Sequence, residues 1–230
     1  MNTSINPRRA IAAVLGTALL AVPLAACGGD SDAADGDSSS SSNSSSSDSP
    51  PKAVASLEAI PGGTTQITLD TGFTDALTSL GLTPGLVGDA ELTEAGELRF
   101  PITGGNVTIF TPGEVSPYVV GQIHHDSSGL SLTAGDTVVE LNNLNVDPTV
   151  SRVYGDVEVG DEVVAKNAYL FTLNGSTLKP LAMEGTDAVL EGTKVFISPD
   201  AAPLLNDTFG TDAVTPELLV GVAKITVNTK

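Results

Sequence analysis

Short apolar runs separated by turn-forming residues fill the chain from about residue 52 to residue 230. Their apolar residues are mostly Val, Leu, Ile and Ala, and the runs lie close together, which favours strands over a βαβ arrangement. Joints such as Ala134-Gly135-Asp136 and Val159-Gly160-Asp161 are typical of tight antiparallel connections. We therefore expect one all-β domain over residues 52–230, mainly an antiparallel sandwich or barrel.

The expected strands can be placed from these runs. We predict them at residues 65–69, 97–101, 106–110, 118–124, 129–133, 137–142, 150–158, 162–172, 178–183, 187–197 and 218–228. Thr103-Gly104-Gly105-Asn106 and Asn174-Gly175 are two further candidate tight turns. In the last strand Ala223, Ile225 and Val227 recur at every second position, which indicates one buried face.

Two short helices are expected to interrupt the strands, at residues 73–80 and 199–209. Ser198-Pro199 has the residue types of a helix start, and Gly81 and Gly210 are suited to helix ends. Their apolar residues recur at helical spacing. We expect both helices to cover open ends or edges of the sheet.

The first 27 residues have a different character. Arg8 and Arg9 precede an apolar run over residues 10–24, which is too short to span a bilayer. The sequence Leu24-Ala25-Ala26-Cys27 then supplies the only cysteine of the chain. This pattern resembles the lipobox of bacterial lipoproteins.

The lipobox resemblance implies that residues 1–26 are a signal peptide and that Cys27 is acylated. Two or three acyl chains make a firm anchor. We therefore expect a lipoprotein of the cell membrane, attached by lipid at the extracytoplasmic face. The alternative is an ordinary secretory signal with a chance cysteine.

Residues 27–51 hold the lipidated cysteine and a linker with ten serines between Ser38 and Ser49. Aspartates are scattered through the same segment, and no hydrophobic core can be built from it. We expect a disordered, acidic tether that holds the domain away from the membrane.

Charge and cysteine content exclude several classes of function. Loss of residues 1–26 reduces ten basic residues to eight against 28 acidic ones, a net charge of about −20. Nucleic acid is therefore not expected as a partner. With Cys27 acylated, the domain has no thiol for a disulfide, a thiolate metal site or a cysteine nucleophile.

Motifs for catalysis are few. Ser176 and Lys179 match S-x-x-K, but they follow a turn signal, and on a strand they would point to opposite faces. The sequence has no G-x-S-x-G, Walker or H-E-x-x-H motif. We expect a protein that is not an enzyme and has no catalytic residues, with a serine hydrolase as the alternative.

The two histidines of the chain, His124 and His125, are adjacent on an expected strand. Their rings should point to opposite faces, His125 with Ile123 and Val119, so only one can line a given pocket. Both are candidate ligand-binding residues, and Asp126 could orient one of them. Adjacent histidines on a strand rarely chelate one ion, so no metal is expected. The competing interpretation is a turn-end histidine bonded to backbone.

Four segments resemble a β-rich domain of secreted and surface proteins of high-GC Gram-positive bacteria. They are RFPITGG (99–105), GQIHHDSSGLSL (121–132), VVELNNLNVD (138–147) and AAPLLNDTFGTDAV (201–214). The strand, glycine and histidine before the G-x-L turn are also distantly similar to the HtaA-type haem-uptake domain. In that family a tyrosine ligates haem iron and a histidine supports it; here only the histidine matches, as His124 or His125, and the helix at 73–80 has no tyrosine.

Two hypotheses of function follow from the sequence. The first is a non-catalytic binding or structural module that presents the acidic domain to an envelope protein, with no cofactor. The alternative is a carrier of haem or another small ligand that uses His124 or His125.

Overall fold

One antiparallel sheet of 14 strands, curled upon itself, accounts for most of the domain. The computed structural model describes residues 50–160 and 162–230. The expected signal peptide, Cys27 and nearly all of the linker lie outside the described residues. The expected fold class, all-β and mainly antiparallel with two short helices, is confirmed.

The bounds of the elements are as follows. The strands are β1 (Ala53–Leu57), β2 (Gly63–Leu69), β3 (Thr83–Gly88), β4 (Glu91–Leu92), β5 (Leu98–Pro101), β6 (Gly104–Phe110), β7 (Val119–His125), β8 (Ser128–Ala134), β9 (Thr137–Asp147), β10 (Arg152–Val159), β11 (Glu162–Asn174), β12 (Ala182–Glu184), β13 (Asp187–Ile197) and β14 (Leu219–Val227). The helices are α1 (Thr71–Ser79) and α2 (Ala201–Phe209), with a 3-10 turn η1 at Gly175–Thr177.

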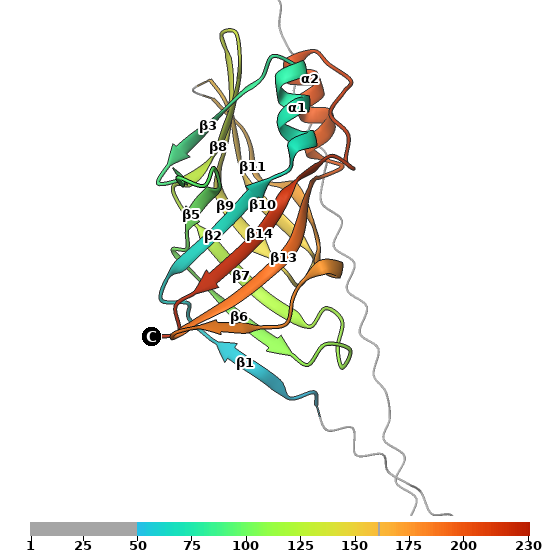
Figure 1. The fold of residues 1–230 in the computed structure, drawn as a ribbon. Coiled ribbons are helices and arrows are strands. Elements are labelled where there is room, and N and C mark those ends of the chain that lie inside the picture. The colour runs from blue at the N-terminus through green and yellow to red at the C-terminus, as the bar shows by residue number, and fades with distance from the viewer. Residues whose placement is uncertain (1–49, 161) are drawn as a thin grey trace, which may run out of the picture. The chain divides into compact units, whose positions relative to one another are not determined.

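The order of strands in the sheet is β1-β6-β7-β9-β10-β11-β13-β14-β2-β5-β4. Off this path, β8 joins β3 to β9, and β12 pairs with β13. β1 and β4 at the two ends of the path do not pair with each other, so the curled sheet stays open. It has one wall formed by β13, β14 and β2 and an opposite wall formed by β7, β9 and β10 (Figure 1).

Ten of the eleven strands expected from the sequence are present, β13 with the expected bounds and the others with shifted ends. The strand expected at 178–183 is present only as the short β12, because residues 178–181 are not in a strand. β1, β3 and β4 were not expected, because β1 and β4 are short and β3 contains a proline and two glycines, residues that weaken a strand signal. The tight connections at Ala134–Thr137 and Val159–Glu162 are confirmed by the pairing of β8 with β9 and of β10 with β11.

Two other expected turns are wrong. Gly104 and Gly105 lie inside β6, which pairs with β1 and β7 rather than with the preceding β5. Asn174-Gly175 opens η1 instead of a hairpin, and Ser176 therefore lies in a 3-10 turn rather than on a strand. At Gly104 the chain has crossed to a strand distant from β5 in the sheet, whereas beyond η1 it continues along β13, the strand with which both β11 and β12 pair. Local turn residues reveal neither course.

Both helices lie at the same end of the curled sheet (Figure 1). α1 is capped by the Asp70 side chain, which accepts a hydrogen bond from Gly72 N–H at 2.9 Å. α2 begins two residues later than expected, but Ser198 still serves its start, because its Oγ accepts from Ala201 N–H at 2.9 Å. The same hydroxyl donates to the Tyr169 carbonyl at 2.6 Å and so fixes α2 to β11.

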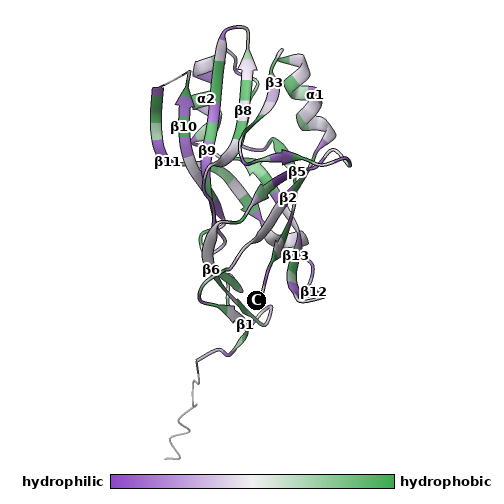
Figure 2. Cartoon of the chain, turned by 90° about the vertical axis from the view of Figure 1, so that its left-hand side faces the viewer, coloured by the Kyte–Doolittle hydropathy of each residue, from purple (hydrophilic) through white to green (hydrophobic). Residues whose placement is uncertain are grey.

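Hydrophobic and hydrophilic residues alternate along many strands, as period-two burial requires (Figure 2). The buried side chains of both walls and both helices form one apolar core. No helix within residues 50–160 and 162–230 is long and apolar enough to cross a membrane.

Candidate functional site

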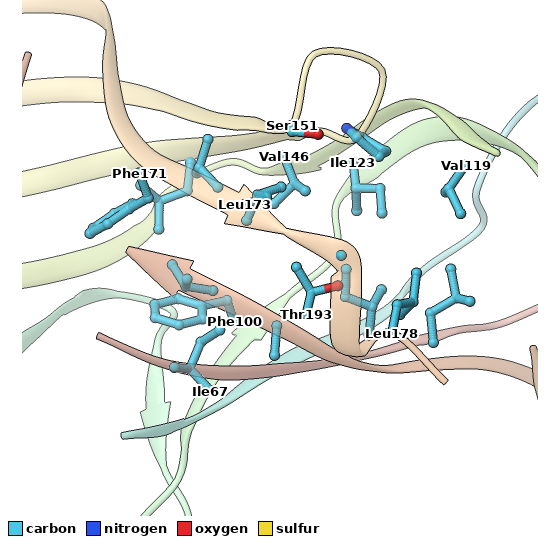
Figure 3. A pocket seen from close by; sticks show the side chains of 18 of the residues that line it. Ile67, Phe100, Val119, Ile123, Val146, Ser151, Phe171, Leu173, Leu178 and Thr193 are labelled. Carbon is cyan, nitrogen blue, oxygen red and sulfur yellow. The ribbon is translucent and has the colours of Figure 1, made fainter. Parts of the chain in front are cut away.

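An apolar cavity lies between the two walls of the curled sheet. The space available there to the centres of water molecules is about 160 Å³. Phe171, Val146 and Ile123 face Phe100 and Ile67 across it (Figure 3). Most other lining residues are also aliphatic, and they come from strands on both sides of the sheet.

Among the residues that line this cavity, His125 is the only histidine, and none is a lysine or an arginine. Only 2 % of the surface of His125 is exposed. Its Nε2 lies 2.7 Å from Thr65 Oγ1, and its Nδ1 lies 3.2 Å from the Leu144 carbonyl oxygen. Phe100 meets the imidazole edge-on, with ring centroids 6.5 Å apart. His125 on β7 thus connects the wall of β7 and β9 to β2 and β5 across the core.

The protonation state of His125 follows from these partners. Burial lowers its pKa from 6.5 to about 4, against the opposing effect of the Leu144 carbonyl. The imidazole is therefore neutral at pH 7. Because a carbonyl can only accept, Nδ1 carries the proton, and Nε2 accepts from the Thr65 hydroxyl.

His124 lies outside the cavity. Its ring is half-exposed on the outer face, and Nε2 is 3.5 Å from Gln122 Oε1. The two adjacent rings thus take opposite sides of β7, as strand geometry requires. Of the two candidate ligand-binding histidines, the structure places only His125 in a cavity wall. Asp126 is exposed and bonds to Thr103 rather than to either imidazole.

None of the three tyrosines is among the hydrogen-bond or ring partners of His125. Tyr118 lines the cavity, but it precedes His125 by seven positions, or roughly 20 Å along an extended strand. Tyr154 and Tyr169 pack together with centroids 6.0 Å apart, and Arg152 lies 4.3 Å above the Tyr169 ring. Neither of these two tyrosines lines the cavity.

Two further apolar cavities adjoin the first. One, of about 280 Å³, lies between residues of β1, β6 and β7 and residues of β12, β13 and β14. The other, of about 240 Å³, lies beneath α1, α2 and β3. We call the cavity of about 280 Å³ the seam cavity and the cavity of about 240 Å³ the helix cavity. The cavity lined by His125 is the central cavity. No Lys, Arg, Asp or Glu lines any of the three among the described residues.

The residues considered for catalysis have other partners. The hydroxyl that meets the imidazole belongs to Thr65, whereas the Ser128 hydroxyl donates to the backbone carbonyl of His125 at 3.2 Å. Lys179 pairs with Glu191 at 2.8 Å. In the part of the chain that the structure describes, no group of three or more His, Cys, Asp or Glu could hold a metal ion.

Sequence reasoning missed Thr65 and Phe100 as partners of His125. Period two on residues 65–69 places Thr65 on the face of Ile67, which does line the central cavity. That signal marks Thr65 as inward-facing. It does not indicate contact with a histidine 60 positions away, which depends on how the sheet curls.

Comparison with known proteins identifies the fold. No protein-family model matches the sequence, and no curated protein sequence matches it. Among solved structures, the C-terminal domain of HtaA from Corynebacterium glutamicum is similar, with a TM-score of 0.50 and 15% identity over 74% of this chain and 97% of that domain. The haem-binding protein HtaB from the same organism gives a TM-score of 0.42 and 9% identity over 76% and 96% of the two chains. The expected likeness to the HtaA-type domain is thus supported at the level of fold.

Proposed function

We propose that this domain is a non-catalytic carrier that holds an apolar small ligand inside its curled sheet. The observation that carries this proposal is the central cavity, about 160 Å³ with almost wholly apolar walls. An apolar cavity of about 150 Å³ in another protein is large enough to bind benzene. Ligand sites of this kind combine apolar walls with a small number of placed polar groups. Here those groups include His125 and Tyr118.

His125 is the ligand-contacting histidine in this proposal. It lines the central cavity and is neutral, so it can exchange its hydrogen bond to Thr65 for one to a ligand without burying a charge. His124 on the outer face has no such part.

Haem is the specific ligand candidate that the fold favours, through the similarity to the HtaA domain. Two features weigh against it. Both nitrogens of His125 are engaged, and Tyr118, which directly precedes β7, lies too far from His125 to share an iron with it. A haemin titration followed in the Soret band tests this candidate. Saturable 1:1 binding lost in His125→Ala but kept in His124→Ala supports haem; no shift, or one unchanged in both variants, rejects it.

We further propose that the carrier is tethered to the cell membrane at its extracytoplasmic face. The support is the lipobox-like Leu24-Ala25-Ala26-Cys27 sequence followed by the serine-rich linker. An envelope protein would then be the donor or recipient of the ligand. The anchor is tested by incorporation of labelled palmitate and by fractionation of the cells. We expect the wild type to be labelled and to sediment with the membrane, and Cys27→Ser to lose both properties. A wild-type protein that stays unlabelled contradicts the anchor.

The carrier itself is tested with a neutral fluorescent probe, N-phenyl-1-naphthylamine, and the chain from Gly28 to Lys230. We expect saturable binding that weakens roughly tenfold or more in Ala223→Leu, because the larger side chain fills volume of the central cavity that the probe needs. Ala95→Leu, on an exposed loop, adds the same side chain outside the cavity and should bind as wild type. No saturable binding, or equal binding in both variants, contradicts the carrier and favours the surface module.

A further inference from the structure

We infer that the ligand is the long linear acyl chain of an uncharged or zwitterionic amphiphile, threaded through the three cavities with its head group outside. This inference rests on the proposed function, because it requires the interior to be the ligand site. It adds the shape, the chemical class and the route of the ligand.

The three cavities form one row. Ile123, Leu190 and Ile225 line both the seam cavity and the central cavity. Leu98, Leu130, Phe171 and Val220 line both the central cavity and the helix cavity. Each shared side chain forms part of the wall between two cavities, so rotamer changes of these side chains would join the cavities.

The row is as long as an acyl chain. β13 runs along all of it, with Ala188 in the seam cavity, Thr193 in the central cavity and Ile197 in the helix cavity. From Ala188 to Ile197 an extended strand covers roughly 30 Å. A bilayer core of about 30 Å is filled by two acyl chains end to end, so one long chain fits with room to spare.

The shape and chemistry of the walls select a flexible chain. A row of separate cavities suits a ligand that can bend, whereas a rigid macrocycle needs one wide cavity. The walls are mostly Leu, Ile and Val, which gain from burying methylene groups, and no charged side chain lies among them. A charged head group would be unpaired inside, so it must remain at the surface.

The seam cavity is the point of access. One of its sides includes β1 and the other includes β12, which pair only with β6 and β13 respectively. Opening this side breaks no ladder between the two strands. Met183 of β12, at the rim of the seam cavity, is 57% exposed and offers an apolar surface for the first contact. The helix cavity, at the other end of the row, lies beneath α1, α2 and β3, and its lining residues Leu86 and Leu92 are also exposed, at 40% and 61%.

The test is a chain-length series of linear 1-alkanols that displace N-phenyl-1-naphthylamine from the chain Gly28 to Lys230. We expect affinity to rise about threefold to fourfold for each added methylene and then to level off once the row is full. The carboxylate of equal chain length should bind no more tightly than the alkanol, since the chain carries 28 acidic residues.

Variants at the two junctions test the route. Val220→Phe, at the junction with the helix cavity, should move the plateau to shorter alkanols and leave the shortest ones unaffected. Leu130→Phe at the same junction is a milder replacement, and a thermal melt verifies that each variant folds. Leu190→Phe, at the junction with the seam cavity, should weaken alkanols of every length.

The outcomes separate this inference from the carrier proposal. Probe binding with no gain beyond the shortest alkanols overturns the acyl-chain inference and leaves the carrier. Saturable haemin binding that the alkanols do not displace also overturns the acyl-chain inference and indicates that the ligand is a macrocycle. Failure of the probe and of all alkanols overturns both proposals.

Discussion

At the scale of single residues, the contact between Thr65 and His125 links two parts of the chain 60 positions apart. Both side chains are buried, with 5% and 2% of their surfaces exposed. We predict that Thr65→Val lowers the free energy of unfolding by about 1–3 kcal/mol, because it leaves Nε2 of His125 without a donor. Thr65→Ser keeps the hydroxyl and should cost less. Urea denaturation at pH 7 measures both, and equal losses would show that the hydrogen bond contributes nothing.

The pH dependence of stability should report on His125. Its pKa is about 4 in the folded state and 6.5 in the unfolded state, so between these values the unfolded chain binds the extra proton. The stabilising contribution is complete above pH 6.5 and is lost as the pH falls toward 4. The loss amounts to about 3 kcal/mol at ~1.4 kcal/mol per pKa unit.

This prediction is tested by urea denaturation of wild type and His125→Gln from pH 7 to pH 4. Wild type should lose the extra ~3 kcal/mol relative to the variant. Asp156 and Glu191, whose pKa values are lowered by the Asn167 N–H and by Lys179, titrate in both proteins and cancel in the comparison. His124→Gln should follow wild type. Parallel curves for wild type and His125→Gln would contradict a buried neutral imidazole.

At the scale of elements, the start of α2 depends on Ser198 rather than on Asp200, the residue directly before the helix. Ser198 is fully buried and bonds to both Ala201 N–H and the Tyr169 carbonyl, whereas Asp200 makes no capping bond. We predict that Ser198→Ala lowers the free energy of unfolding by about 1–2 kcal/mol. Asp200→Ala should cost under about 1 kcal/mol, as a charge near a helix start. Thermal denaturation compares them, and a larger loss for Asp200→Ala would refute this assignment.

The elements show where sequence reasoning succeeds. Alternation along β14, the apolar run of β13 and the Ser198 to Gly210 boundaries of α2 are local patterns, and each predicts its element. The turn expected at Gly104-Gly105 fails because Gly105 serves the close approach of β6 to β7: a Cβ on Gly105 would lie 2.1 Å from the Gln122 carbonyl oxygen. Here the reason for glycine lies on the neighbouring strand β7, 17 positions later in the chain, and not in a local turn.

The candidate site shows the same limit more strongly. Alternation on β7 predicts that one of the two histidines faces inward, and it groups His125 with Ile123. The partners Thr65 and Phe100 and the whole cavity arise from the curl of the sheet, which brings β2 and β5 opposite β7. Curvature is a property of many strands together, so no local pattern contains it.

At the scale of the whole molecule, the central cavity lies between one wall built from strands near both ends of the described chain and an opposite wall built from its middle. Ile67 of β2 and Ala223 of β14 line one side, while Ile123 of β7 and Val146 of β9 line the other. An occupant therefore contacts both walls at once. Binding inside should stabilise the curled sheet as a unit, whereas a ligand on the outer face would contact one wall.

Hydrogen exchange tests this coupling. With hexadecanol at 100 times its dissociation constant, we expect amides that exchange through partial openings of the sheet, which release the ligand, to slow by up to about 100-fold, or ~2.7 kcal/mol. The slowing should extend over β2 and β14 in one wall and β7 and β9 in the other. Val220→Phe, which shortens the row of cavities, should reduce it at the same alkanol concentration. Protection confined to one wall would place the ligand outside the sheet, and the interior would then lose its role as the binding site.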